Sequence, residues 1–148
     1  GGTVARWAVG AEPGSPLGLL DQGGIFDPPD DTEHLLLACD ETGLPGVCGI
    51  LRDLLRDAVG QAHLEVPTSA DIRDLPLPPG LQVEWLPRDD ASCQPGTLAL
   101  AAVHAARLPA LSYAYLVGES TLATSGRRAL KKVGLPVSRI SFTGYWKA

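Results

Sequence analysis

From residue 33 onward, short apolar runs alternate with stretches of helical periodicity. The first run, His34–Cys39, is apolar at nearly every position, which is typical of a parallel strand covered on both faces. Strands are predicted at residues 34–39, 61–66, 81–86, 112–117 and 139–143. This alternation predicts an α/β fold with a five-stranded parallel, doubly wound sheet and right-handed crossovers.

Four helices are predicted between these strands. The first is capped by Thr42, has Pro45 in its first turn, and carries an apolar stripe from Leu44 to Ala58. A short helix is expected over residues 69–75, a third begins at the capping residue Thr97, and a fourth opens at Ser120 or Thr121. The fourth helix ends in cations, which suit a helix C-terminus, and Gly134 and Pro136 stop it.

The first thirty residues follow a different pattern. Turn-forming clusters rich in proline and glycine flank one short apolar run, residues 17–20, which predicts a lone strand. A single strand cannot bury itself, so this stretch needs a sheet that lies outside the chain. We therefore place a domain boundary at residue 30, with one domain over 31–148. The chain contains no methionine, so we expect it to be a piece of a longer protein.

Composition excludes several classes of protein. The formal net charge of −5 argues against a nucleic-acid binder, which usually has a basic excess on one face. The most apolar segment, Leu98 to Val117, is interrupted by His104, Arg107 and Pro109 and is too polar for a membrane span. The three cysteines form no C-x-x-C pair and have no zinc-like spacing. A cytoplasmic protein without a metal site is expected.

In an open parallel sheet, ligands bind beyond the carboxyl ends of the strands. Asp40, Glu41 and Thr42 follow the first predicted strand, where no G-x-G-x-x-G loop is present. The two carboxylates would repel a phosphate but suit ribose hydroxyls or a nicotinamide amide. The alternative is that they only cap the helix that follows.

The other strands are also followed by polar, aromatic or glycine residues. Arg88, after the third strand, has a planar fork that matches the oxygens of a 2′-phosphate, although a solvated loop would look the same. A glycine after a strand would let the flat ring of a ligand approach the backbone, or it would only allow close packing within the protein. The remaining candidates are hydroxyls after the second strand, a glycine and an acid after the fourth, and aromatics and a cation after the fifth: Thr68, Ser69, Gly118, Glu119, Tyr145, Trp146 and Lys147.

No acid–base or nucleophilic catalyst is predicted. His34, His63 and His104 are scattered along the chain, and no Ser/His/Asp or Cys/His arrangement can be built from the sequence. This pattern is typical of a hydride-transfer enzyme, in which the cofactors carry the chemistry and the protein orients them.

Four segments carry a family resemblance, the most specific being Asp40-Glu41-Thr42 with Pro45, and Gly144-Tyr145-Trp146-Lys147. The other two lie around Trp85–Arg88 and Tyr115–Ser120. Together they resemble the siderophore-interacting protein family of flavin-dependent ferric-siderophore reductases, whose nucleotide-binding domain is ferredoxin-reductase-like. Arg6-Trp7-Ala8 and the turns after it look like the closing part of that family's flavin-binding β-barrel, which assigns residues 1–30 to a remnant of the barrel.

The resemblance implies a role for each candidate residue. Asp40, Glu41 and Thr42 would line the nicotinamide side, and Arg88 would hold the adenosine 2′-phosphate, which favours NADPH over NADH. Lys147 would help to attract an anionic ferric siderophore. The pocket would also be bordered by Gly118 and Glu119, with Tyr145 and Trp146 near the flavin. The main FAD-binding residues would lie upstream, so this chain alone is expected to be inactive.

Two alternatives remain at this point. A phospho-receiver-like signalling module also has five βα units, and Asp40 and Glu41 match its acidic cluster. It lacks the phospho-acceptor aspartate after the third strand, where Pro87 and Arg88 stand. The other alternative is a flavin reductase of the ferredoxin-reductase type that uses a different electron acceptor.

Overall fold

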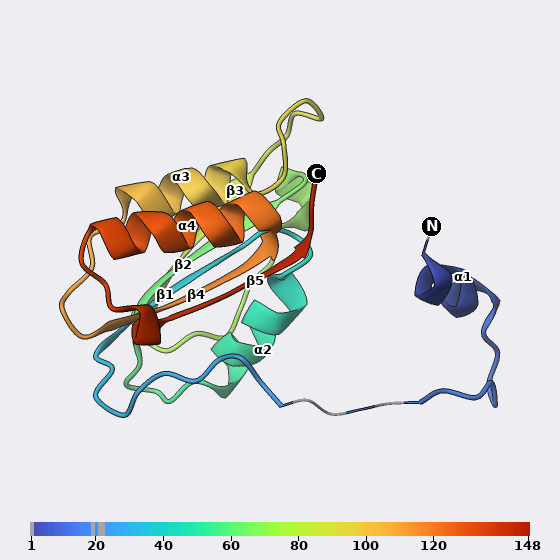
Figure 1. The fold of residues 1–148 in the computed structure, drawn as a ribbon, viewed down its shortest axis with the longest axis horizontal. Helices are drawn as coiled ribbons and strands as arrows, with labels where there is room; N and C mark the ends of the chain where they lie inside the picture. The colour runs from blue at the N-terminus through green and yellow to red at the C-terminus, as the bar shows by residue number, and fades with distance from the viewer. Residues whose placement is uncertain (1, 19, 21–22) are drawn as a thin grey trace.

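The computed structural model describes residues 2–18, 20 and 23–148, and its centre is a five-stranded, all-parallel sheet (Figure 1). The strand order is β3-β2-β1-β4-β5, which places the first strand in the middle. The strands are β1 (His34–Cys39), β2 (Val59–Val66), β3 (Gly80–Pro87), β4 (Ser112–Glu119) and β5 (Ile140–Trp146). The predicted fold class is confirmed.

Helices cover both faces of the sheet. Figure 1 shows α3 and α4 together on one face and α2 on the other. The helices are α1 (Thr3–Gly10), α2 (Leu44–Asp53), α3 (Thr97–Ala105) and α4 (Ser120–Lys132), with 3₁₀ turns at Ser69–Asp71 and Val137–Arg139. Among the described residues, no helix is long and apolar enough to cross a membrane.

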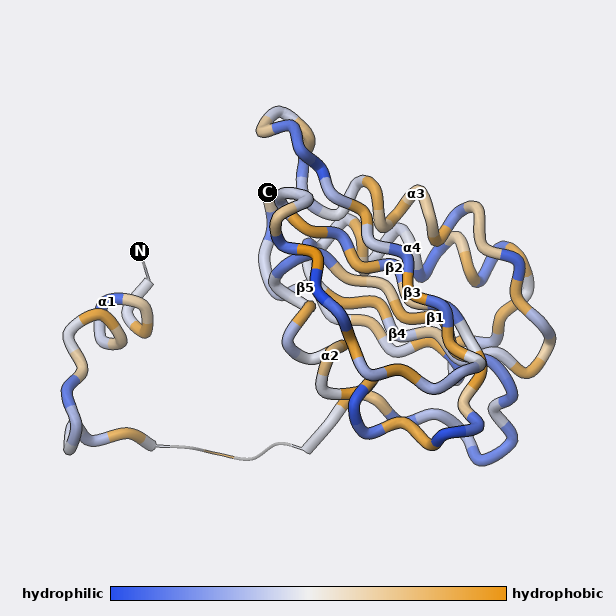
Figure 2. The backbone as a smooth tube through the Cα atoms, turned by 180° about the vertical axis from the view of Figure 1, so that it is seen from behind, coloured by the Kyte–Doolittle hydropathy of each residue, from blue (hydrophilic) through white to orange (hydrophobic). Residues whose placement is uncertain are grey.

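The alternation of side chains along β1 divides the core into two layers. Leu35 and Leu37 pack under α2, whereas Leu36 and Ala38 pack under α3 and α4. Both layers are apolar, so β1 is buried on both faces, as its continuous apolar run predicts. Figure 2 shows the strands as a hydrophobic centre within more polar loops.

The strand order excludes one alternative. A phospho-receiver domain has the order 2-1-3-4-5, whereas this sheet has the order 3-2-1-4-5 of a dinucleotide-binding half. The direction of the sheet connections reverses between β1 and β4, which are neighbours. The candidate site is therefore expected beyond the carboxyl ends of β1 and β4.

The structure corrects two of the predicted helices. α2 ends at Asp53 rather than near Ala58, because Leu54 is extended and the chain turns toward β2, leaving Leu55 75% exposed. The helix predicted over residues 69–75 is a single 3₁₀ turn, because a capping box joins Thr68 to Asp71 and the backbone is extended again at Ile72.

The segment before β1 packs on the sheet through Phe26. Its ring lies edge-on to Tyr113 and Tyr115, with centroid distances of 5.6 and 5.7 Å. The backbone N–H of Asp27 donates to the Tyr113 hydroxyl at 2.9 Å. The predicted strand at 17–20 lies partly outside the described residues, and its described residues are not in a strand. The boundary at residue 30 stays a prediction.

Candidate functional site

The candidate site lies at the carboxyl edge of the sheet, where β1, β4 and β5 end side by side (Figure 1). Asp40 follows β1 directly, Gly118 and Glu119 end β4, and Trp146 ends β5. Because these strands are parallel and adjacent, residues 106 positions apart in the chain meet there.

The buried carboxylate of Asp40 joins these segments. Its Oδ1 atom accepts hydrogen bonds from the backbone N–H and the hydroxyl of Thr42, at 2.8 and 2.6 Å. Its Oδ2 atom accepts from the backbone N–H of Glu119 at 2.6 Å and from the Trp146 indole at 3.3 Å. Asp40 therefore holds the start of the α2 loop, the end of β4 and the end of β5 in one arrangement.

Gly118 makes room for that carboxylate. Its φ is +128°, and a Cβ atom placed there would lie 2.5 Å from Oδ1 of Asp40. The tight-packing interpretation of Gly118 accounts for this geometry. The approach of a ligand ring to its backbone stays a prediction.

Glu119 caps α4, a role for which the sequence analysis named no residue. Its carboxylate accepts from the backbone N–H groups of Thr121 and Leu122, and from Ala148 at 3.4 Å. Burial raises the pKa of Glu119, but these hydrogen bonds outweigh burial and hold the pKa below its ordinary value. The helix start itself, Ser120, is as predicted.

Arg88 lies between two carboxylates at the end of β3. It donates two parallel hydrogen bonds to Glu41, both at 2.8 Å, and one to Glu65 at 2.7 Å. The Arg88 side chain is 8% exposed and that of Glu65 is 0% exposed. The bond to Glu41 raises the pKa of Arg88, and the same bond lowers the pKa of Glu41. The fork predicted to bind a phosphate is thus engaged by protein carboxylates.

Glu65 is the site residue that sequence reasoning missed. Besides Arg88, it accepts from the backbone N–H groups of Gly96 at 2.7 Å and Ala99 at 2.9 Å. It therefore caps α3 in place of the predicted Thr97, which makes no capping hydrogen bond through its side chain. The strand also carries Gln61 and His63, so its pattern does not single out Glu65, and the burial and pairing of this acid are seen only in the structure.

Thr68 and Ser69 form an exposed turn beside Arg88. Thr68 donates its N–H and hydroxyl to Asp71, at 3.0 and 2.9 Å. Ser69 donates its N–H to Asp89 at 2.8 Å and its hydroxyl to the same carboxylate. Both hydroxyl protons are engaged, but the hydroxyl oxygens can still accept hydrogen bonds.

The end of β5 presents aromatic surface at the same edge. Tyr145 is 49% exposed and lies near the buried Tyr115. Trp146 is half-buried, and its backbone carbonyl accepts from the Ser120 hydroxyl at 2.5 Å. Lys147 is exposed beside them. The strand predicted at 139–143 extends to Trp146, so Tyr145 and Trp146 lie within β5 and only Lys147 follows it.

The predicted residues thus fall into two linked groups. Asp40 joins Thr42, Gly118, Glu119 and Trp146, whereas Glu41 turns away to pair with Arg88 near the Thr68–Ser69 turn. The three histidines lie elsewhere: His63 pairs with Glu84 inside the sheet, and His104 is exposed on α3. No group of metal-ligating side chains is found in the part of the chain that the structure describes.

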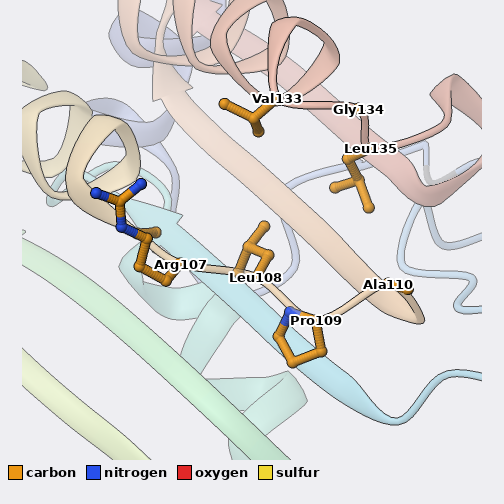
Figure 3. Close-up of a pocket in the computed structure, with 8 residues that line it drawn as sticks. Arg107, Leu108, Pro109, Ala110, Val133, Gly134 and Leu135 are labelled. Atoms are coloured by element: carbon orange, nitrogen blue, oxygen red, sulfur yellow. The ribbon is translucent and has the colours of Figure 1, made fainter.

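The polar and aromatic groups exposed at this edge fit a pyridine nucleotide. Exposed hydroxyl oxygens at Thr42, Thr68 and Ser69 suit ribose hydroxyls and a carboxamide, and the exposed Tyr145 ring suits a flat heterocycle. A cavity of about 290 Å³ lies at the opposite, amino end of β4 and β5, lined by residues 106–110 and 133–135 (Figure 3). It is not part of this edge.

Comparison with known proteins identifies the family. The siderophore-interacting protein family matches residues 32–148. The ferric vibriobactin reductase ViuB of Vibrio cholerae is 30% identical over 146 residues, covering 95% of this chain and 53% of that protein. The NADPH-dependent ferric-chelate reductase of Escherichia coli is 26% identical over 155 residues, covering 100% of this chain and 58% of that protein.

Solved structures agree with this match. The siderophore-interacting protein SipS from Aeromonas hydrophila superposes with a TM-score of 0.74 at 25% identity, covering 100% of this chain and 63% of that chain. The chain spans about half the length of the curated relatives it matches. By its sequence match over most of its length and by its fold, the chain belongs to the siderophore-interacting protein family.

Proposed function

We propose that this chain forms the pyridine-nucleotide site of a ferric-siderophore reductase. The observation that carries the proposal is the polar carboxyl edge between β1 and β4, organised by Asp40, in a chain of the siderophore-interacting family. Two relatives named as ferric reductases support the reaction class. Residues 1–30 are proposed to complete a flavin-binding barrel, and the protein to work in the cytoplasm.

When bound, NADPH or NADH would supply a hydride to FAD for the reduction of siderophore-bound Fe(III), which releases the iron. The residues of this chain are proposed to bind and orient the coenzyme, and none of the described residues is proposed to take part in the hydride transfer itself. Thr42 is proposed to face the nicotinamide and its ribose, next to the strand ends that Asp40 holds together. Glu41 pairs with Arg88, so it is proposed to lie on the adenosine side instead. Asp40 itself acts as a positioning residue, since its oxygens are already used within the protein.

The aromatic end of β5 is proposed to face the flavin. Tyr145 presents 49% of its surface, and Trp146 is held in place by its hydrogen bonds to Asp40 and Ser120. Lys147 adds an exposed cation there, which would attract an anionic ferric siderophore. Gly118 and Glu119 would border the nicotinamide pocket.

The choice of coenzyme depends on Arg88. A 2′-phosphate can bind the guanidinium of Arg88 only by displacing Glu41. Glu65 cannot be displaced, because its carboxylate is buried and also accepts from the backbone N–H groups of Gly96 and Ala99. NADPH is favoured by the relative that is named as NADPH-dependent. NADH stays a possible coenzyme under the same proposal.

Titration of the ¹⁵N-labelled chain with NADPH and with NADH, followed by NMR, tests the proposed site. The backbone amides at 40–43, 68–69, 88–90 and 118–120 should shift in a saturable way, because they end or follow the strands at the carboxyl edge. The amides at 106–108, 110 and 133–135 belong to residues that line the cavity at the other end, and they serve as an internal control. Shifts confined to that control group, or no shifts at millimolar coenzyme, would contradict the proposal.

An acceptor screen separates the proposed reaction from a flavin reductase with another acceptor. The screen needs a protein that carries both this chain and its flavin domain, and it compares ferric siderophores with cytochrome and dye acceptors. Faster turnover with the ferric siderophore supports the proposal. Bound flavin in the purified chain itself would contradict the assignment of the flavin site to residues outside it.

A further inference from the structure

Three charged side chains at the ends of β1, β2 and β3 form a compact group, which we call the Arg88 cluster: Glu41, Glu65 and Arg88. Arg88 donates to Glu41 at 2.8 Å through both of its terminal nitrogens and to Glu65 at 2.7 Å through one. The cluster carries one cation and two carboxylates. An arginine here is therefore not an open anion site.

The two acids of the cluster are held very differently. Glu65 is 0% exposed and accepts from the backbone of Gly96 and Ala99 as well as from Arg88, so it belongs to the core. The Glu41 side chain is 31% exposed and lies on the loop between β1 and α2. Glu41 can leave Arg88 for solvent without leaving a buried carboxylate unpaired, whereas Glu65 cannot.

The surroundings add further negative charge. Arg88 lowers the pKa of Glu41, whereas partial burial and the nearby charge of Asp71 act in the opposite direction. Asp89 follows Arg88 directly in the chain. A 2′-phosphate at this point would compete with Glu41 for the same two N–H groups. The phosphate would also be repelled by the carboxylates that remain nearby, those of Glu65, Asp71 and Asp89.

We infer that Glu41 determines how strongly this site distinguishes a 2′-phosphorylated coenzyme from an unphosphorylated one. By occupying the fork of Arg88, Glu41 lowers the preference for NADPH below what Arg88 alone would confer. Removal of its charge and its bidentate contact frees Arg88, still aligned by Glu65, for the phosphate. The inference rests on the proposed function, because it takes this edge as the adenosine-ribose site.

Isothermal titration calorimetry with two small probes tests the inference without enzymatic activity. The probes are adenosine 2′,5′-bisphosphate and 5′-AMP, which differ only in the 2′-phosphate. In Glu41→Gln, the ratio of the 5′-AMP dissociation constant to that of the bisphosphate should rise by about tenfold or more, the size of one charged hydrogen bond. Glu41→Asp, which is too short for the bidentate pair, should raise the ratio less.

Glu84→Gln is the matched control. It removes the same charge from the same region of the sheet, but Glu84 is 59% exposed and pairs with His63 rather than with Arg88. Its ratio should equal that of the wild-type chain. An unchanged or lower ratio in Glu41→Gln, or an equal rise in Glu84→Gln, overturns the inference while the proposed function stands. Failure of the wild-type chain to bind either probe overturns both.

Discussion

At the scale of single residues, the site is organised by buried carboxylates. Asp40, Glu65 and Glu119 are at most 3% exposed, and each accepts hydrogen bonds from backbone N–H groups of a segment distant in sequence or of a helix start. A buried charge is tolerated only with such complete bonding. These acids therefore position the edge of the sheet, and they leave the exposed hydroxyls and aromatic rings to meet a ligand.

Gly118→Ala should destabilise the chain more than a positive φ alone explains. The new methyl group would lie 2.5 Å from Oδ1 of Asp40, in a backbone conformation with φ of +128°. We expect a loss of at least about 2 kcal/mol in the free energy of unfolding by urea. Gly134→Ala is the control: its φ is +98°, nothing lies within 4 Å, and it should cost about 1 kcal/mol. Equal losses would contradict the contact with Asp40.

At the scale of secondary-structure elements, the strands were easier to predict than the residues that cap the helices. His34–Cys39 was predicted with the bounds that the structure has. A strand buried on both faces is a continuous apolar run, which can be identified from the local sequence alone. The hydroxyl caps expected at Thr42 and Thr97 were wrong: neither side chain caps its helix, and the acid that caps α3 comes from β2. Capping from another strand leaves no local pattern.

The cap of α4 should make stability depend on pH in a predictable direction. The folded-state pKa of Glu119 is held below its ordinary value of 4.5. Its contribution is therefore fully present above that value and is lost as the pH falls through the lower, folded-state pKa. At pH 7, Glu119→Gln should cost about 1 kcal/mol in urea unfolding. The difference from the wild-type chain should shrink between pH 6 and pH 3, and a constant difference would contradict this role.

At the scale of the whole molecule, the sheet separates a polar carboxyl edge from an amino edge with its own cavity. The segment around Phe26 packs against β4 on the face that α2 covers, where it contacts two tyrosines. The chain that leads into the sheet is thus part of the packed unit before the predicted boundary at residue 30.

Phe26→Ala tests how much this segment contributes to the fold. The ring packs against the core and lies edge-on to Tyr113 and Tyr115, so its loss should lower the free energy of unfolding by about 1–2 kcal/mol. Ile25→Ala is the matched control, because Ile25 is 45% exposed and contributes only its carbonyl to Tyr113. Chemical denaturation of both variants is the measurement. Similar small losses would show that Phe26 adds nothing to the core.

The sequence by itself determined the parallel α/β sheet and the set of residues at its carboxyl edge. Both follow from local rules: buried runs predict strands, and parallel strands bring the residues after them to one edge. Only the tertiary structure decided which of those side chains pair. Arg88 forms hydrogen bonds with Glu41, 47 residues away, and with Glu65, 23 residues away. The Asp40 carboxylate lies where a side chain at Gly118 would otherwise be. Such contacts depend on strand order and register, which no local pattern encodes.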